Sequence, residues 1–335
     1  MIKVAINGFG RIGRLAFREM ITSNDFDIVA INDLTDAETL AYLLKYDTNH
    51  RSFHEDLISF DNDEIIINNK KRIKVYCEKD PVNLPWSSLG IDVVLECTGL
   101  FTKKEDAEKH ITAGAKKVII SAPGKGDMKT IVYNVNSDTL DGSETVISAA
   151  SCTTNCLAPV LDIIEKNIGI VKGFMTTVHA YTNDQATLDI PHKKGILARR
   201  GRACAMNIVP ASTGAASAIG QVIPSLLGKM DGNAFRVPVS DGSVVDVTLE
   251  LRRNTSVEEI NTLFTNNQNE TLKITLDPIV SSDILGKKTG ALVDGLSTSV
   301  LESEGKQLVK IIAWYDNEMG YTAQMMRTAK KLMNK

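Results

Sequence analysis

The sequence predicts an α/β protein, with a doubly wound, mostly parallel sheet in its first half and an α+β second half built on a mixed or antiparallel sheet. Before Ser151, short apolar stretches alternate with helical ones, which is typical of a parallel sheet covered by helices on both faces. After Ser151, apolar and polar residues alternate within several stretches, which indicates strands with one solvent-exposed face. The length of 335 residues exceeds the ~100–150 residues usual for one domain, so we expect two domains.

The first domain is expected at residues 1–150, completed by a C-terminal helix at 318–335. Its predicted strands are short apolar segments at 2–6, 27–32, 93–95, 118–121 and 146–150. A helix follows the first strand, because apolar residues recur at helical spacing from Ile12 to Met20. A charged stretch at 103–113 predicts a second helix.

The second domain is expected at residues 151–317. Apolar residues from Leu157 to Ile164 predict a helix, in which Pro159 should cause a bend or remove a hydrogen bond. A further helix is expected at 215–227, and strands at 174–180, 245–251, 291–301 and 308–314. The helix that completes the first domain is expected at 321–333.

The composition is that of an ordinary soluble protein, with 43% hydrophobic and 24% charged residues. A net charge of −3 gives no reason to expect nucleic acid or an anionic membrane as the main partner. No secretory signal and no membrane span is evident, and the five scattered cysteines argue against a disulfide framework. We therefore expect a cytoplasmic protein. The histidines show no metal-binding spacing, so no metal is expected, and His50, His54 and His110 lie in polar stretches that we expect to be exposed.

A glycine motif follows the first predicted strand. Gly8, Gly10 and Gly13 form the G-x-G-x-x-G arrangement, in which the glycines permit a tight turn, approach of a pyrophosphate and close helix–strand packing. Asp33 follows 20 residues after Gly13, where a carboxylate would accept hydrogen bonds from the adenosine ribose. The pattern predicts a Rossmann-type dinucleotide-binding domain that prefers NAD, because Asp33 would repel the 2′-phosphate of NADP. The alternative is a glycine turn that serves packing only.

A cysteine lies where the first domain gives way to the second. Cys152 opens a predicted helix, whose positive N-terminal end favours a thiolate. The adjacent Ser151 and Thr153 carry hydroxyl groups, which are uncommon next to a cysteine that packs in an apolar core. His179 lies near the end of a later predicted strand. A thiol with a histidine base predicts nucleophilic catalysis, whereas the alternative reading of Cys152 is a small buried apolar residue.

Several motifs in order make the chain resemble the glyceraldehyde-3-phosphate dehydrogenase family. They are spread along nearly the whole sequence, at 6–13, 44–47, 121–123, 151–156, 179–184, 212–216 and 314–318. The resemblance implies an NAD-dependent, phosphorylating oxidation of D-glyceraldehyde 3-phosphate to 1,3-bisphosphoglycerate in glycolysis. It also implies a homotetramer, in which the basic loop at 183–202, with Pro191, Lys193 and Lys194, reaches a neighbouring subunit.

The resemblance further implies roles for individual residues. Cys152 would be the nucleophile and His179 the base, through a hemithioacetal and then a thioester. One anion pocket would contain Thr182 and Arg236, and the other Ser151, Thr153, Arg199, Thr213 and Gly214. The cofactor would be bound by Arg11 and Ile12 at the pyrophosphate, by Lys79 and Ser121 on the adenosine side, and by Asn317, with Tyr321 nearby, at the nicotinamide amide.

Three other functions remain open at this point. Erythrose-4-phosphate dehydrogenase shares the thiol chemistry but hydrolyses its thioester. A cysteine hydrolase or acyltransferase would leave Asp33 and Asn317 without a role. A binding or adhesion protein without catalysis would not need the complete set of reactive residues.

Overall fold

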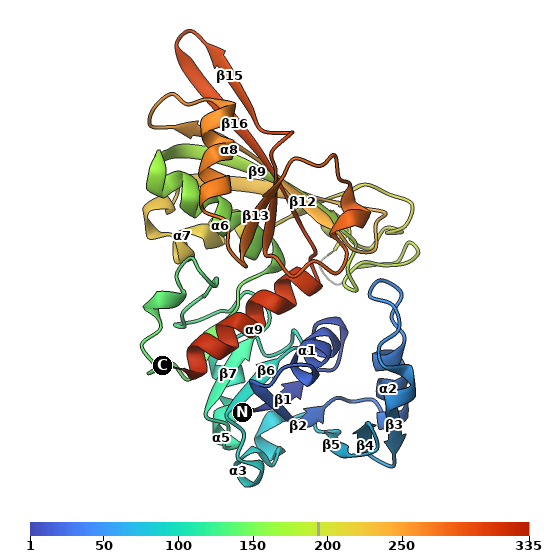
Figure 1. Cartoon of the computed structure of the whole chain (residues 1–335). Coiled ribbons are helices and arrows are strands. Elements are labelled where there is room, and N and C mark those ends of the chain that lie inside the picture. Colours follow the sequence, from blue (N-terminus) through green and yellow to red (C-terminus); the bar gives the residue numbers. More distant parts are fainter. Residues whose placement is uncertain (193–194, 335) are drawn as a thin grey trace. The chain divides into compact units, whose positions relative to one another are not determined.

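The computed structural model describes residues 1–192 and 195–334, which divide into two compact units. Unit 1 contains residues 1–131 and 137–150 and the chain from Met325 onward. Unit 2 contains residues 132–136 and 151–324. Figure 1 shows the strands and helices of each unit. No helix of the described chain is long and apolar enough to span a bilayer.

Unit 1 is a doubly wound sheet, as predicted. The strand order is β3-β4-β5-β2-β1-β6-β7-β8, parallel from β5 to β8 and antiparallel where β3 and β4 join the edge. The strands are β1 (Ile2–Asn7), β2 (Phe26–Asn32), β3 (Ile58–Asp61), β4 (Glu64–Ile67), β5 (Lys71–Tyr76), β6 (Val93–Glu96), β7 (Lys117–Ile120) and β8 (Val146–Ser148). The strand order reverses between β1 and β6, which is the position where such sheets bind ligands.

The helices of unit 1 differ from the prediction, which contained neither a helix at 37–45 nor one at 86–89. They are α1 (Arg11–Ile21), α2 (Ala37–Lys45), α3 (Trp86–Leu89), α4 (Lys104–Ala107) and α5 (Lys109–Thr112), with short 3-10 turns at Glu55–Leu57, Pro81–Asn83 and Ser137–Thr139. The single helix expected at 103–113 is therefore two short helices. They meet at Glu108, which itself keeps helical angles of φ −60° and ψ −16°.

The expectation that His110 is exposed was wrong, because its side chain is fully buried. Trp86 Nε1 donates to His110 Nδ1 at 3.0 Å, which places the imidazole proton on Nε2. Nε2 lies 3.1 Å from the carboxylate of Glu96, which is also buried. Both ring nitrogens therefore have partners, and burial of this polar ring leaves no unsatisfied group.

Unit 2 is built on a mixed sheet, which confirms the predicted α+β class. Its order is β10-β11-β9-β12-β16-β14-β13, with β15 paired to β16. The strands are β9 (Ile170–Ala180), β10 (Val209–Ser212), β11 (Met230–Val237), β12 (Ser243–Leu251), β13 (Leu272–Thr275), β14 (Ala291–Asp294), β15 (Ser299–Ser303) and β16 (Lys306–Tyr315). The pairs β9–β11 and β13–β14 are parallel, and the remaining pairs are antiparallel.

Helices cover one face of this sheet. They are α6 (Cys152–Asn167), α7 (Ala215–Val222) and α8 (Val257–Asn266), which gather together in Figure 1. Short 3-10 turns lie at Ile196–Ala198, Pro224–Leu226 and Ser281–Ile284. The last helix, α9 (Met319–Met333), begins in unit 2 and ends in unit 1.

Strands β10, β11 and β13 and helix α8 were not predicted. Proline and glycine account for two further differences between the observed and the predicted elements of unit 2. The helix expected to reach 227 ends at Val222, just before Pro224. The strand expected at 291–301 is two strands, because Gly295 lies in the turn between β14 and β15. Pro159 does not end α6, which continues to Asn167.

Candidate functional site

A cavity of about 510 Å³ opens in unit 1 at the carboxyl ends of the parallel strands. Its walls come from the residues that follow β1, β2 and β6 and from the segment after β5. The lining residues are Asn7, Gly8, Gly10, Asn32, Asp33, Leu34, Glu78, Lys79, Cys97, Thr98, Leu100 and Phe101. Gly8, Gly10, Asp33 and Lys79, all predicted to bind the cofactor, therefore surround one space.

Two of the motif glycines are required by close backbone contacts. Gly8 has φ +91°, and a Cβ there would lie 2.7 Å from the backbone nitrogen of Thr98. A Cβ on Gly13 would collide with the carbonyl oxygen of Gly8, so only glycine lets α1 start this close to β1. At Gly10 the same position is open space. Gly10 also precedes α1 without a side-chain cap, so backbone N–H groups of the first turn remain available to an anion such as a pyrophosphate.

Asp33 is held in place at the cavity. Its Oδ2 accepts the backbone N–H of Phe9 at 2.7 Å, and its Oδ1 accepts that of Thr35 at 3.2 Å. These bonds fix the carboxylate and leave further lone pairs for a ligand hydroxyl. The cavity, the glycine turn and this carboxylate fit an adenosine dinucleotide.

The other predicted cofactor residues of unit 1 do not line this cavity. Arg11 begins α1, but its guanidinium pairs with Asp47, with Nη2 3.1 Å from Oδ1. Ile12 and Gly13 follow in the same turn, and Ser121 comes directly after β7, next to the thiol of Cys97. Any contact of Arg11 with a pyrophosphate would therefore come from its backbone.

A thiol and an imidazole face each other in unit 2. Cys152 is the first residue of α6, and Ser151 caps that helix by accepting the Thr154 N–H at 3.1 Å. The Sγ of Cys152 lies 3.4 Å from Nε2 of His179, near the end of β9. The residues predicted as nucleophile and base are thus in contact.

Nδ1 of His179 has two polar neighbours, the Ala180 carbonyl, which can only accept, and the Arg236 guanidinium, which can only donate. Nδ1 lies 2.7 Å from the carbonyl oxygen of Ala180, and donation to that oxygen leaves the Nε2 lone pair facing the thiol. The ring also packs edge-on against Tyr315, with ring centroids 5.9 Å apart. Arg236 pairs with His179 across the parallel strands β11 and β9, and its Nη1 lies 3.0 Å from Nδ1.

Burial and the guanidinium keep the imidazole neutral. Burial first, and then the positive charge of Arg236, lower the pKa of His179 to about 3. Burial raises the pKa of the Cys152 thiol, while Arg236 acts in the opposite direction. At neutral pH the imidazole is therefore a free base, which is the form that the predicted role of His179 requires.

Arg236 and Thr182 also lie together. Nη1 of Arg236 donates to Thr182 Oγ1 at 3.1 Å and to the Ala180 carbonyl at 3.0 Å. The Thr182 hydroxyl donates to Asp184, which forms an ion pair with Arg200. A hydroxyl and a guanidinium beside the thiol are the groups that a phosphate would need.

The residues predicted for the other anion pocket are less closely associated. The Thr153 hydroxyl bonds to Tyr315 at 2.9 Å, and the Thr213 hydroxyl accepts the Ala215 N–H at 3.2 Å next to Gly214, which precedes α7. In the described part of the chain, no hydrogen bond joins Ser151 or Thr153 to Thr213 or Gly214. The Arg199 side chain is exposed. Lys193 and Lys194 lie outside the described residues.

Two family models match the chain. One describes the NAD binding domain of glyceraldehyde 3-phosphate dehydrogenase and matches residues 2–104, and the other describes its C-terminal domain and matches residues 151–317. Glyceraldehyde-3-phosphate dehydrogenases of Clostridium pasteurianum and Clostridium acetobutylicum are each 57% identical over 98% of this chain and 97% of their own length. That of Streptococcus pyogenes is 55% identical, with the same coverage. The chain belongs to the glyceraldehyde-3-phosphate dehydrogenase family.

Membership of this family confirms the predicted class of enzyme, an oxidoreductase with NAD as its cofactor. The match to the C-terminal domain starts at Ser151 and ends at Asn317, so it covers the thiol, the imidazole and Arg236. The glycine turn and Asp33 lie within the match to the NAD binding domain.

Sequence reasoning overlooked two side chains that organise the family's C-terminal domain in this chain. The buried hydroxyl of Tyr315 bonds to Thr153 and Thr177, at 2.9 and 2.8 Å. Ser243, which is also buried, donates to Oδ1 of Asn317 at 2.7 Å. Tyr315 lies within the motif at 314–318 and could have been singled out there, whereas no sequence signal distinguishes Ser243 from other serines.

Proposed function

We propose that the protein oxidises D-glyceraldehyde 3-phosphate with NAD and inorganic phosphate to 1,3-bisphosphoglycerate, as a step of glycolysis. The observation that carries this proposal is the 3.4 Å contact between Cys152 Sγ and His179 Nε2 at the N-terminus of α6. The names of the relatives support the choice of substrate over erythrose 4-phosphate.

The first half of the proposed reaction makes a thioester on Cys152. His179, neutral in this environment, takes the thiol proton at Nε2, and the thiolate adds to the aldehyde carbon. The imidazolium then returns that proton to the resulting oxyanion, which gives the hemithioacetal and a neutral His179. Arg236 would stabilise the thiolate while the proton is on the imidazole. NAD supplies the hydride acceptor when bound, so no other oxidant is needed. The hemithioacetal hydroxyl loses its proton to the neutral His179 while its carbon gives up a hydride, and the carbonyl of the thioester forms.

The second half releases the acyl group to phosphate. A phosphate oxygen attacks the thioester carbon, the carbon–sulfur bond breaks, and Cys152 leaves as a thiolate that can recover a proton from His179. The product is an acyl phosphate. We propose that Thr182 and Arg236 bind one phosphate group, while Ser151, Thr153, Arg199, Thr213 and Gly214 bind the other.

The proposed cofactor contacts involve separate residues for the pyrophosphate, the adenosine and the nicotinamide. We propose that Gly8, Gly10 and Gly13 with the backbone of Arg11 and Ile12 accommodate the pyrophosphate, and that Asp33 accepts from the ribose. Lys79 and Ser121 would complete the adenosine side, and Asn317 would bind the nicotinamide amide.

A homotetramer also belongs to this proposal. In the single chain, the face of the unit 2 sheet opposite the helices leaves Phe174 69% exposed and Val178 36% exposed. Apolar side chains grouped on an open sheet face favour association with another subunit. The cytoplasmic location remains a prediction.

The test is NADH formation by the purified protein with glyceraldehyde 3-phosphate, with and without inorganic phosphate. We expect sustained turnover only with phosphate, and slower oxidation of erythrose 4-phosphate. Phosphate-independent turnover, or a preference for erythrose 4-phosphate, would overturn the proposal.

Cys152→Ala should abolish oxidation while the dissociation constant for NAD stays within about twofold of wild type, because the thiol binds substrate and does not hold the cofactor. Glu258→Gln, at an exposed position of α8, is the control and should leave turnover unchanged. Retention of substantial turnover by Cys152→Ala would contradict the thioester route.

A further inference from the structure

A buried serine hydroxyl lies next to the side chain proposed to hold the nicotinamide. Ser243 begins β12 and pairs in register with Tyr315 of β16, two residues before Asn317. Ser243 is 1% exposed and Asn317 is 6% exposed. Their bond, from Ser243 Oγ to Asn317 Oδ1, is 2.7 Å long.

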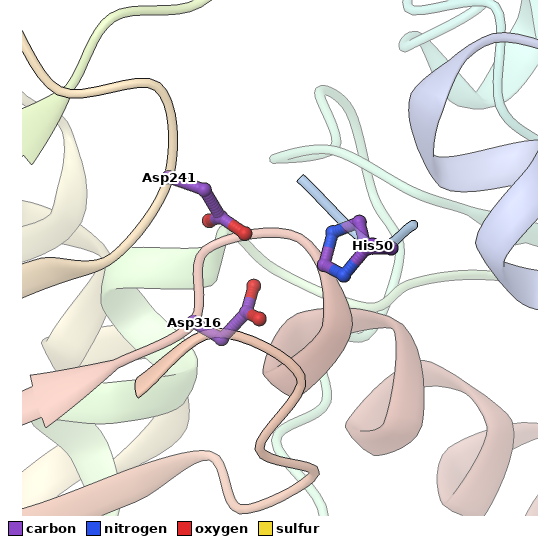
Figure 2. Close-up of side chains that lie close together, drawn as sticks. All are labelled: His50, Asp241 and Asp316. Carbon is purple, nitrogen blue, oxygen red and sulfur yellow. The ribbon is translucent and has the colours of Figure 1, made fainter. Parts of the chain in front are cut away.

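The backbone on either side of Asn317 is already fixed. Oδ1 of Asp316 accepts the N–H groups of Glu318 and Met319, at 2.8 and 2.7 Å, and thereby caps the start of α9. Its other oxygen, Oδ2, accepts the N–H of Gly286 at 2.7 Å. Figure 2 shows the Asp316 carboxyl group close to that of Asp241, which precedes β12 (His50, also labelled there, belongs to unit 1). What remains to be set is the orientation of the Asn317 amide, because its oxygen and nitrogen are nearly equal in size.

The hydrogen bonds of Ser243 set that orientation. Its Oγ accepts the N–H of Ala180 at 3.1 Å, so the single hydroxyl proton is free to be donated to Asn317. In the structure the amide oxygen receives it, since an amide NH₂ cannot accept. The NH₂ group then points away from Ser243, and within residues 1–192 and 195–334 no protein atom accepts from it.

We infer that Ser243 is a positioning residue that fixes the Asn317 amide so that its NH₂ group is presented to the carbonyl oxygen of the nicotinamide carboxamide. This inference rests on the proposed function, in which Asn317 binds that carboxamide. The same hydroxyl also connects this contact to the base, because the Ala180 peptide donates its N–H to Ser243 and offers its carbonyl to His179 Nδ1. Ser243 thereby couples the position of the hydride acceptor to that of the imidazole.

The test compares binding of three ligands by fluorescence or calorimetry. They are NAD, its thionicotinamide analogue, in which a weakly accepting sulfur replaces the carboxamide oxygen, and ADP-ribose, which lacks the nicotinamide. In wild type, NAD should bind more tightly than the thio analogue. In Ser243→Ala the Asn317 amide can turn, so the dissociation constant for NAD should rise about three- to tenfold, the equivalent of one neutral hydrogen bond. The preference for NAD over its thio analogue (the NAD-to-thio preference) should fall by a similar factor. ADP-ribose affinity should not change.

Thr298→Val is the matched control, because Thr298 is also buried and also donates to an asparagine Oδ1, that of Asn261, at 2.8 Å. It should lose a comparable amount of stability without altering any of the three affinities. Ser243→Cys, which keeps the volume and a weak donor, should restore part of the preference, and it replaces Ser243→Ala if that variant does not fold. In an Asn317→Ala background, Ser243→Ala should have no further effect on the preference.

The inference is overturned if Ser243→Ala keeps the wild-type NAD-to-thio preference, whether or not Asn317→Ala loses it. This outcome is separate from failure of the proposed function, which is judged by NADH formation from the aldehyde in the wild-type protein. A wild-type protein that binds NAD with the expected preference but does not oxidise the aldehyde would leave the Ser243 result standing and remove only the substrate assignment.

Discussion

The positive charge of Arg236 should be a main reason why His179 stays neutral, and Arg236→Gln tests this directly. Nη1 of Arg236 lies 3.0 Å from Nδ1 of His179, and the pKa of the imidazole is lowered to about 3 by burial and then by this arginine. Arg200 lowers the pKa further and Asp184 raises it, while Cys152 and Tyr315 also border the ring. The variant removes the nearest cation and leaves the burial in place.

The expected change in the pKa of His179 follows from the short distance between its imidazole and the Arg236 guanidinium. Two like charges ~4 Å apart repel by about 4 kcal/mol at an effective dielectric constant of ~20, which is roughly a thousandfold change in proton affinity. The direction of the change follows because the positive charge of Arg236 disfavours protonation of His179. In wild type the pKa is lowered to about 3, so the imidazole is neutral near pH 7. In Arg236→Gln the proton should remain bound to a distinctly higher pH, although burial keeps the pKa below its ordinary value.

The assay is a pH titration of ¹³C-labelled histidine side chains by NMR. The chain has five histidines, and the resonance missing from His179→Asn identifies the one of interest. Arg236→Lys, which keeps a cation, should titrate closer to wild type than Arg236→Gln, and Arg252→Gln removes an exposed charge of the same unit as a control. Inorganic phosphate added to wild type should raise the pKa of His179, because an anion on Arg236 compensates its charge. An unchanged His179 titration in Arg236→Gln would refute the reasoning and leave burial as the sole cause.

Two further predictions concern His179 as the base and Asp33 as the residue that binds the ribose. His179→Asn should slow acylation of Cys152 roughly 10²–10⁴-fold through loss of a positioned base, measured by rapid mixing with excess aldehyde, and a rate within a few-fold of wild type would remove His179 from this role. Asp33→Gly should weaken NAD binding by about 1.5–3 kcal/mol for each charged hydrogen bond lost and should improve use of NADP, compared by steady-state kinetics with both cofactors. An unaltered NAD-to-NADP ratio would show that the carboxylate does not meet the ribose.

Local sequence was sufficient for features whose geometry is local. The turn from Gly8 to Gly13 and the carboxylate of Asp33 depend on a few neighbouring residues, and the structure places Gly8, Gly10 and Asp33 around one cavity. The strands β3, β4 and β5 were not predicted, although Ile73 and Val75 of β5 alternate with charged residues; β3 and β4 have only four residues each. Strand β10 contains Pro210, which argues against a central strand, and it is tolerated because β10 lies at the edge of its sheet.

The protonation state of His179 could not be derived from sequence, because it depends on a residue 57 positions away. The sequence placed only the positive N-terminal end of a predicted helix beside the thiol of Cys152, with His179 as its base. The parallel register of β9 and β11 instead places Arg236 against the ring, so the cation beside the thiol is a guanidinium and the imidazole is left free to act as a base. If Arg236 also binds the substrate phosphate, that phosphate compensates the charge that keeps His179 neutral, and the imidazole should accept the proton from Cys152 more readily once the aldehyde is bound. The arginine proposed for substrate binding would thus also determine when the base can be charged.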